Sequence, residues 1–124
     1  MPYPKHIEQK LEFDQIRQLL VNKCISEVGV EYVAKMRFAN RFDIVEKMLL
    51  QTNEFKRILI EELPFPSEHY YNIQPYIRKA SIEGAFLMEE ELHQIKLLLQ
   101  TFAAICKYFE ERNEKYPQVA ALFA

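Results

Sequence analysis

The chain is 124 residues long, 49% of its residues are hydrophobic, 27% are charged, and its formal net charge is −2. This composition is ordinary for a globular protein and too apolar for an intrinsically disordered one, and the length fits a single domain over residues 1–124. The small negative charge gives the chain as a whole no electrostatic advantage for nucleic acid, and its two glycines favour helices over β-hairpins.

The first strong pattern is an apolar stripe that runs through Phe13, Ile16, Leu20 and Cys24 at steps of three and four. It predicts a helix over about residues 13–23 with this stripe facing a core. Ser26 is expected to cap the next helix, which continues to Met36, because its hydroxyl can accept a hydrogen bond from an amide one turn on. Gly29 lies inside that second helix, where we expect it to permit close helix packing.

A long helix of about twenty residues is predicted next. Asn40 is the expected cap, with Asp43 three residues on in the manner of a capping box, and the apolar pattern continues to Leu63. Pro64 and Pro66 then end the helix, because neither has a backbone N–H to donate.

The segment PFPSEHYYN at 64–72 is the only substantial predicted loop, and it carries His69, Tyr70 and Tyr71. Aromatic side chains in a loop can stack on bases or dock against a partner protein. They can also fold down and cap the helices, and we favour this second reading because the prolines restrict the loop.

Two further helices complete the pattern. Asn72 is the expected cap of a short helix with Pro75 in its first turn, and this helix ends near Gly84, where a left-handed residue is needed. The last long helix begins in the acidic run 89–91, whose charge suits the positive end of a helix dipole. These elements predict an all-α fold, an irregular bundle of about five to six helices.

The last long helix has the strongest periodicity in the chain, a heptad-like seam that alternates steps of four and three. The seam residues are Met88, Leu92, Ile95, Leu99, Phe102, Cys106 and Phe109. The seam could form a coiled coil with another chain, but further apolar residues at Leu97, Leu98, Ala103 and Ile105 widen it, so we favour packing within one chain. The apolar ending VAALFA would expose Leu122 and Phe123 unless they tuck back, and we expect the natural polypeptide to continue.

Chemistry-bearing motifs are missing from the sequence. Gly29 and Gly84 stand alone and no Gly-Lys-Ser/Thr sequence occurs, which excludes a phosphate-binding loop. Cys24 and Cys106 make no zinc spacing, and no serine lies in a nucleophile-elbow pattern. We expect no catalytic, cofactor-binding or metal-binding residue and no enzyme activity. No signal peptide or apolar run of membrane-spanning length occurs either, so we expect a cytoplasmic protein with no membrane partner.

Two weaker candidates for function remain. Lys35, Arg37 and Arg41 are the best local basic patch for nucleic acid, although a solvated stretch around a helix end is the favoured reading. The run from His93 to Lys96 is similar to the histidine phosphotransfer signature, in which an exposed helical histidine precedes a lysine. That family follows the lysine with glycine, and Leu97 stands here instead. A free-standing helical adaptor or phosphotransfer module using His93 is therefore the alternative function.

The segment IEQKLEFDQIRQLL at 7–20 resembles the opening of proteins in the type-2 branch of the MutS family, large ATP-driven DNA-handling proteins. The similarity continues in the family's order through CISEVG at 24–29, Met-Arg at 36–37, TNEFKRIL at 52–59 and NIQPYIRKASIEGAFL at 72–87. Five short motifs thus cover essentially the whole chain. As departures, Tyr76 and Ile77 replace the smaller Ala-Leu of the family, and Met88 stands where a capping Ser or Asp is common.

The resemblance implies the N-terminal part of a helical core, or lever, region. The longer parent would continue through a clamp, a dimerising ATPase domain that binds ATP and Mg, and usually a C-terminal Smr nuclease domain. No catalytic or ATP-binding residue transfers to this chain. The implied role is mechanical: these helices would couple the ATPase dimer to the clamp, with the remaining domains of the parent as partners. The parent would be a homodimer that acts on branched DNA and suppresses recombination, or that acts on stalled ribosomes.

Overall fold

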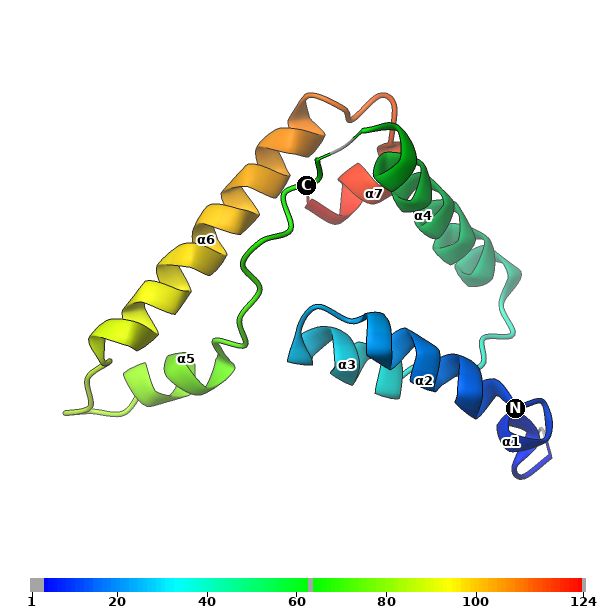
Figure 1. Ribbon diagram of the computed structural model, residues 1–124, viewed down its shortest axis with the longest axis horizontal. Coiled ribbons are helices and arrows are strands. Elements are labelled where there is room, and N and C mark those ends of the chain that lie inside the picture. The colour runs from blue at the N-terminus through cyan, green and yellow to red at the C-terminus, as the bar shows by residue number, and fades with distance from the viewer. Residues whose placement is uncertain (1–3, 63, 124) are drawn as a thin grey trace. The chain divides into compact units, whose positions relative to one another are not determined.

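The computed structural model describes residues 4–62 and 64–123, and in these residues the only regular secondary structure is helical. The predicted all-α class is therefore confirmed. The chain divides into two compact units, Met1–Asn40 and Arg41–Ala124, and each is described by itself (Figure 1). A single domain over 1–124 stays a prediction, and the predicted helix end at Leu63 lies outside the described residues.

The first unit is built from three helices, α1, α2 and α3 (Figure 1). Their bounds are Ile7–Lys10, Phe13–Lys23 and Glu27–Ala34. The second of these bounds matches the predicted helix over 13–23. The Ser26 cap is also confirmed, because its Oγ accepts a hydrogen bond from the amide of Gly29 at 3.2 Å. This bond satisfies one of the free amides at the start of α3.

Two predictions about the first unit are wrong. Ile16 and Leu20, the middle of the predicted core-facing stripe, are 49% and 40% exposed. Phe13 and Cys24 at the ends of the stripe are half-buried, but between them the half-buried positions are Arg17 and Val21, so the covered face of the helix is turned from the middle of the apolar stripe. A Cβ built on Gly29 would meet its nearest neighbours at 3.5 Å, an ordinary van der Waals distance, so close packing does not require this glycine.

The second unit holds two long helices and three short helical segments (Figure 1). They are α4 at Phe42–Glu61, α5 at Gln74–Ala80, α6 at Glu89–Glu110, α7 at Pro117–Ala120 and the 3₁₀ helix η1 at Ala121–Phe123. The predicted twenty-residue helix is confirmed as α4. The predicted start of α6 in the acidic run is confirmed too, and Glu91 Oε2 accepts a hydrogen bond from the Met88 amide at 2.7 Å.

The ends of the helices differ slightly from the predictions. The residue before α4 is Arg41, not Asn40, and the Arg41 side chain pairs with Asp43. The residue before α5 is Ile73, although Asn72 Oδ1 does accept a hydrogen bond from the Gln74 amide at 3.2 Å. The predicted cap residues are therefore one position too early in both helices. Gly84 has the predicted left-handed backbone, with φ at 79°, but α5 ends at Ala80 and not near Gly84 as predicted.

The core of the second unit is small and lies where α4, α6 and α7 meet. Its buried residues are Ile58, Ile105, Phe109, Tyr116 and Val119. Partly buried side chains pack around them, namely Phe55, Phe65, Tyr70, Tyr108 and Ala120. The segments that form this core are far apart in the sequence, so it fixes the ends of the two long helices beside α7.

The predicted seam of α6 is mostly uncovered, which corrects the expectation that it packs within the chain. The buried residues of α6 are Leu98, Thr101, Ile105 and Phe109. Only Phe109 belongs to the seam, whereas Leu92 and Leu99 are more than half exposed. The helix is rotated so that the additional apolar row through Leu98 and Ile105 faces the chain. Among the described residues, no helix is long and apolar enough to cross a membrane.

Candidate functional site

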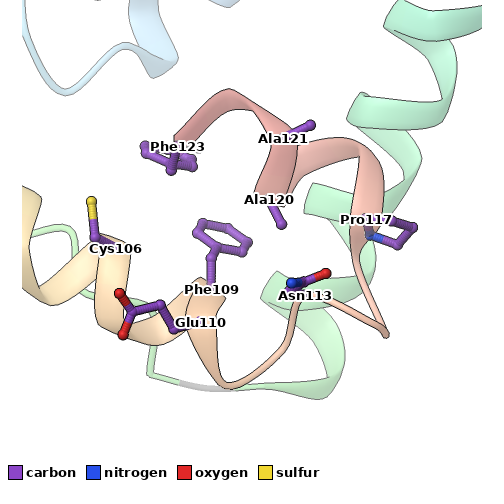
Figure 2. A pocket seen from close by; sticks show the side chains of 8 residues that line it. All are labelled: Cys106, Phe109, Glu110, Asn113, Pro117, Ala120, Ala121 and Phe123. Carbon is purple, nitrogen blue, oxygen red and sulfur yellow. The ribbon is translucent and has the colours of Figure 1, made fainter.

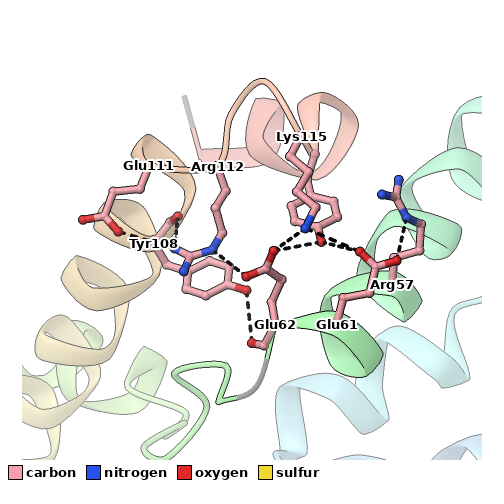
Figure 3. Close-up of polar contacts among 8 residues, drawn as sticks. Arg57, Glu61, Glu62, Tyr108, Glu111, Arg112 and Lys115 are labelled. Carbon is pink, nitrogen blue, oxygen red and sulfur yellow. Dashed lines mark hydrogen bonds and ion pairs between the residues drawn. The ribbon is translucent and has the colours of Figure 1, made fainter.

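A polar cluster joins the C-terminal ends of α4 and α6, and we call it the junction (Figure 3). Its residues are Arg57, Glu61, Glu62, Tyr108, Glu111, Arg112, Lys115 and Tyr116. They come from the last turn of α4, the end of α6 and the turn that leads into α7. The cluster is balanced in charge, with three carboxylates and three cations.

Glu62 is the centre of the junction. Its carboxylate accepts hydrogen bonds from Arg112 Nε at 3.3 Å and from Lys115 Nζ, and it lies 3.5 Å from the Tyr116 hydroxyl. Its backbone carbonyl accepts a hydrogen bond from the Tyr108 hydroxyl at 3.4 Å. Glu62 is the C-terminal cap residue of α4, where helix carbonyls lack partners and the helix dipole attracts cations. The end of α6 therefore supplies donors and positive charge to the end of α4.

Aromatic rings hold the cations of the junction in place. Arg112 lies over the Tyr108 ring at 4.0 Å from its centroid and donates a hydrogen bond to the Tyr108 carbonyl at 3.2 Å. Arg57 lies over the Tyr116 ring at 5.3 Å and pairs with Glu61 at 3.4 Å. Such contacts between a cation and a ring face add to the ion pairs. The Tyr116 hydroxyl donates to Glu61 at 3.2 Å, so Tyr116 contacts both members of this α4 ion pair.

The ion pairs shift the titration of the junction. The hydrogen bond from Lys115, joined by that from Arg112, holds the pKa of Glu62 below its ordinary value. Burial acts to raise the pKa of Glu61, but hydrogen bonds from Arg57, Tyr116 and Lys115 outweigh it and lower the pKa overall. The hydrogen bond to Glu62 raises the pKa of Lys115. Every charged form named here is therefore favoured by folding.

These shifts predict how the stability of the chain depends on pH. Because the folded-state pKa values of Glu61 and Glu62 lie below 4.5, their contribution is present above about pH 4.5 and is lost as the pH falls through the lowered values. The contribution of Lys115 is present below its ordinary pKa of 10.5 and is lost as the pH rises through the raised value. Thermal unfolding followed by circular dichroism should therefore show a loss of stability on the acid side.

A matched pair of variants assigns the acid-side loss to the junction. Glu62→Gln should make the unfolding temperature less dependent on pH below about 4.5 than in the wild type, because the variant has no carboxylate to protonate there. Glu83→Gln changes an exposed carboxylate outside the junction and should keep the wild-type dependence. The prediction would be contradicted if the unfolding temperature fell equally with decreasing pH in Glu62→Gln and in the wild type.

A buried carboxylate fixes α7 on α4. Glu54 is 9% exposed, and its Oε2 accepts a hydrogen bond from the Val119 amide at 2.8 Å. Gln51 Nε2 lies 3.5 Å from the carbonyl of Gln118. Amides in the first turn of a helix lack intrahelical partners, and a carboxylate satisfies one of them here. This bond docks the short helix α7 on the middle of α4.

A half-open apolar pocket of ≈ 270 Å³ lies beside the junction (Figure 2). Its lining residues are Cys106, Phe109, Glu110, Asn113, Pro117, Ala120, Ala121 and Phe123. The rings of Phe109 and Phe123 are stacked, with centroids 5.0 Å apart and planes 10° apart. Phe123 is therefore tucked back onto α6, whereas Leu122 stays 61% exposed.

The three residues of the predicted basic patch are divided between the two units of the chain. Lys35 and Arg37 belong to the first unit and Arg41 belongs to the second. Lys35 lies 3.9 Å from Glu31, and Arg41 pairs with Asp43 at 2.6 Å, so both cations have acidic neighbours close in sequence. Contact of the three basic residues with nucleic acid stays a prediction.

The aromatic loop lies partly on the core. Tyr70 is half-buried against the core, burial raises its pKa, and its hydroxyl lies 3.5 Å from the Pro66 carbonyl. This position is the one expected if the loop caps the helices. The rings of His69 and Tyr71 are stacked with centroids 6.3 Å apart. Docking of a partner or a base on these side chains stays a prediction.

The other predicted sites stay as expectations. His93 is exposed on α6, and Leu97, which stands at the position of the phosphotransfer glycine, is half-buried on the same helix. In the described part of the chain, no group of three or more His, Cys, Asp or Glu residues is placed to hold a metal ion.

Sequence reasoning missed the roles of Arg17 and of the junction tyrosines. The Arg17 guanidinium donates to the carbonyl of Val33 at 2.5 Å and of Met36 at 3.2 Å, and pairs with Glu8 at 3.1 Å. It therefore holds the C-terminal end of α3 against α2. A long cation on the helix face beside an apolar stripe is too common to have singled it out.

Comparison with known proteins gives one consistent result. The chain is 30% identical to Endonuclease MutS2 of Latilactobacillus sakei over 118 residues, which are 94% of this chain and 15% of that protein. It is 30% identical to Endonuclease MutS2 of Staphylococcus epidermidis over 112 residues, 86% of the chain and 14% of the relative. It is 37% identical to Endonuclease MutS2 of Staphylococcus saprophyticus over 90 residues, which are 73% of this chain and 11% of that protein. No family model and no solved structure matches.

Proposed function

Because this chain belongs to the type-2 MutS, or MutS2, family, we propose that it is a non-catalytic helical segment of a MutS-like DNA-binding ATPase and endonuclease. The chain spans about 15% of the length of the first relatives it matches. In this proposal, ATP, Mg and the nuclease chemistry belong to other parts of the parent protein. The fold class agrees with the helical core, or lever, region that the sequence resembles.

The observation that carries the mechanical part of the proposal is the junction. Two helices of about twenty residues are tied to each other where both end, through Glu62 on one side and Arg112 on the other. A helix rises about 1.5 Å per residue, so each arm is roughly 30 Å long. While it holds one angle, a joint at one end of two long arms transmits a displacement of one arm to the other. This arrangement supports a role in coupling an ATPase dimer to a clamp.

The partners we propose for the arms are the remaining domains of the parent. Apolar residues far from the junction are exposed on both helices, including Met48 and Leu49 of α4 and Leu92 and Leu99 of α6. Contiguous exposed apolar residues mark surfaces that pack against other protein. Their coverage by the rest of a longer chain agrees with the small share of the relatives that this chain spans. We further propose that the parent is a cytoplasmic homodimer that acts on branched DNA or on stalled ribosomes.

The gene and the isolated chain together test the proposal. We expect the reading frame to continue past Ala124 into a nucleotide-binding loop, and a stop codon directly after Ala124 would contradict the assignment to a longer ATPase. The isolated chain should hydrolyse no ATP above the buffer background. It should bind a four-way DNA junction only weakly at physiological salt, because its net charge is −2. Low-micromolar binding would show that DNA contact, not coupling, is its role.

A further inference from the structure

We propose that the junction is a hinge with an electrostatic clasp: α6 pivots on a small apolar contact with α4, and the ion pairs of Glu62 with Arg112 and Lys115 hold it at one angle. The clasp is a property of the chain itself, while its use in coupling rests on the function proposed above. Such a hinge needs two bodies, a pivot between them, and a clasp that can open while the pivot persists.

The first body is α4 with α7. The buried hydrogen bond from the Val119 amide to Glu54 at 2.8 Å lies about two helical turns from the end of α4, well away from the ion pairs of Glu62. Val119 is itself buried against Ile58 in the core. These contacts are desolvated, so salt has little effect on them. We therefore expect α7 to stay on α4 when ion pairs at the surface are weakened.

The second body is α6 with α5. The Tyr76 hydroxyl donates a hydrogen bond to Gln94 Oε1 at 2.7 Å. Lys79 Nζ pairs with Glu91 at 2.9 Å, near the start of α6. These contacts attach α5 to the end of α6 that is opposite to the junction. The short helix therefore adds to the far end of the arm and makes no part of the pivot.

The pivot is an apolar contact at one end of each arm. Phe65, from the loop after α4, packs edge-on against Phe55 of α4 at 5.2 Å and Tyr108 of α6 at 5.3 Å. Beside it, Phe109 of α6 is buried with Ile58 of α4 and stacks on Phe123 of η1 at 5.0 Å, so the pivot also touches the segment after α7. This contact is confined to one end of α6, and Leu92 and Leu99 farther along the helix are more than half exposed. A contact of this kind defines where α6 is held and leaves its angle open.

The clasp is what remains to set the angle, and it is partly accessible to solvent. The side chains of Glu62, Arg112 and Lys115 are 21%, 28% and 46% exposed. Salt screens ion pairs most where solvent reaches them, with a Debye length of about 10 Å at 0.1 M and about 3 Å at 1 M, so the effect should be largest at the half-exposed Lys115. High salt should therefore weaken the clasp and leave the apolar pivot intact.

The length of α6 makes a change of angle measurable. Its 22 residues span about 33 Å, so a rotation of about 10° at the junction moves the far end by about 6 Å. Fluorophores are placed at two exposed positions, Leu49 on α4 and Leu92 on α6, which are 64% and 53% exposed. Each is changed to cysteine after Cys24 and Cys106 have been replaced by serine in the 124-residue chain.

The experiment is single-molecule energy transfer between these labels at low salt and at about 1 M NaCl. We expect a narrow distance distribution at low salt that broadens or shifts at high salt. Glu62→Gln should give the broadened distribution at low salt already. A second label pair at Leu49 and Leu122, both on the α4–α7 body, should show no change with salt. Arg41→Gln removes an ion pair outside the junction and should behave as the wild type.

One result overturns the hinge: the distance between labels at 49 and 92 stays narrow and unchanged in the wild type at both salt concentrations. Should Glu62→Gln lose helical circular dichroism, the salt titration of the wild type decides alone. Broadening of the control pair to the same extent would also overturn the proposal, because the whole unit would then be loosening. A rigid junction leaves the proposed function standing, since that rests on the reading frame and on the assays of ATP hydrolysis and DNA binding.

Discussion

Replacing Tyr116 by alanine is expected to lower the free energy of unfolding of the second unit by about 3–5 kcal/mol, the range for truncating a large buried aromatic side chain. Tyr116 is 0% exposed and is one of the two largest fully buried side chains described. The substitution removes its packing in the core and the hydroxyl that donates to Glu61 at 3.2 Å. Equilibrium urea denaturation followed by circular dichroism measures the change.

Two controls separate packing from hydrogen bonding. Tyr116→Phe keeps the ring and loses only the hydroxyl, so it should cost about 1 kcal/mol. Phe86→Ala removes a ring that is 74% exposed in the same unit and should cost less than about 0.5 kcal/mol. A cost for Tyr116→Ala no larger than that of Phe86→Ala would mean that the junction does not organise this unit. Because small domains are stable by only about 5–15 kcal/mol, the loss expected for Tyr116→Ala is a large share of the total stability.

Local patterns predicted the helices of this chain well. The bounds of α2, the Ser26 cap, the length of α4 and the left-handed Gly84 all follow from rules that act over a few residues. Periodicity fixes where a helix lies, and caps and prolines fix most of its ends to within a residue or two, the end of α5 at Ala80 being the exception. Arg41 and Ile73 at the cap positions show the size of the remaining error.

The faces of the helices could not be predicted in the same way. On α2 the side of Arg17 is covered and Ile16 is exposed, and on α6 the row of Leu98 is covered and Leu99 is exposed. A helix with apolar residues on more than half of its circumference gives no single direction to its core. Which row is buried depends on which other elements are present to cover it. The prediction that the exposed rows are buried therefore assumed covering elements that the described residues do not supply.

The junction was also beyond the sequence patterns. Glu62 meets Lys115 and Arg112 across 53 and 50 positions in the chain, and Tyr116 lies in a turn that shows no periodicity. Charged residues at helix ends are expected from the dipole alone, so Glu62 and Arg112 gave no signal of their own. A pairing over such a separation becomes visible only when the two long helices are seen to end at the same place.

The second large effect is expected from a pair of neighbours on α4, Ile58 and Leu59. Ile58 is 0% exposed at the centre of the core, and Ile58→Ala should cost about 2–5 kcal/mol, since it leaves a cavity where α4, α6 and α7 meet. Leu59 is 46% exposed, and Leu59→Ala should cost less than about 1 kcal/mol in the 124-residue chain. Urea denaturation of the two variants in parallel tests the difference, and equal costs would contradict the placement of the core.

Leu59 also connects the stability of this chain with the proposed function. If the exposed apolar rows are surfaces that pack against the rest of a longer protein, Leu59→Ala should be mild in the isolated chain and should cost more in the longer one, where its surroundings are buried. Ile58→Ala should cost a similar amount in both, because its cavity is enclosed within the second unit. The ratio of the two costs, measured in both settings, therefore reports whether this part of α4 is covered by the remaining domains. A Leu59→Ala cost that stays below about 1 kcal/mol in the longer protein would mean that this row faces solvent there too, and that coupling runs through the arm of α6 alone.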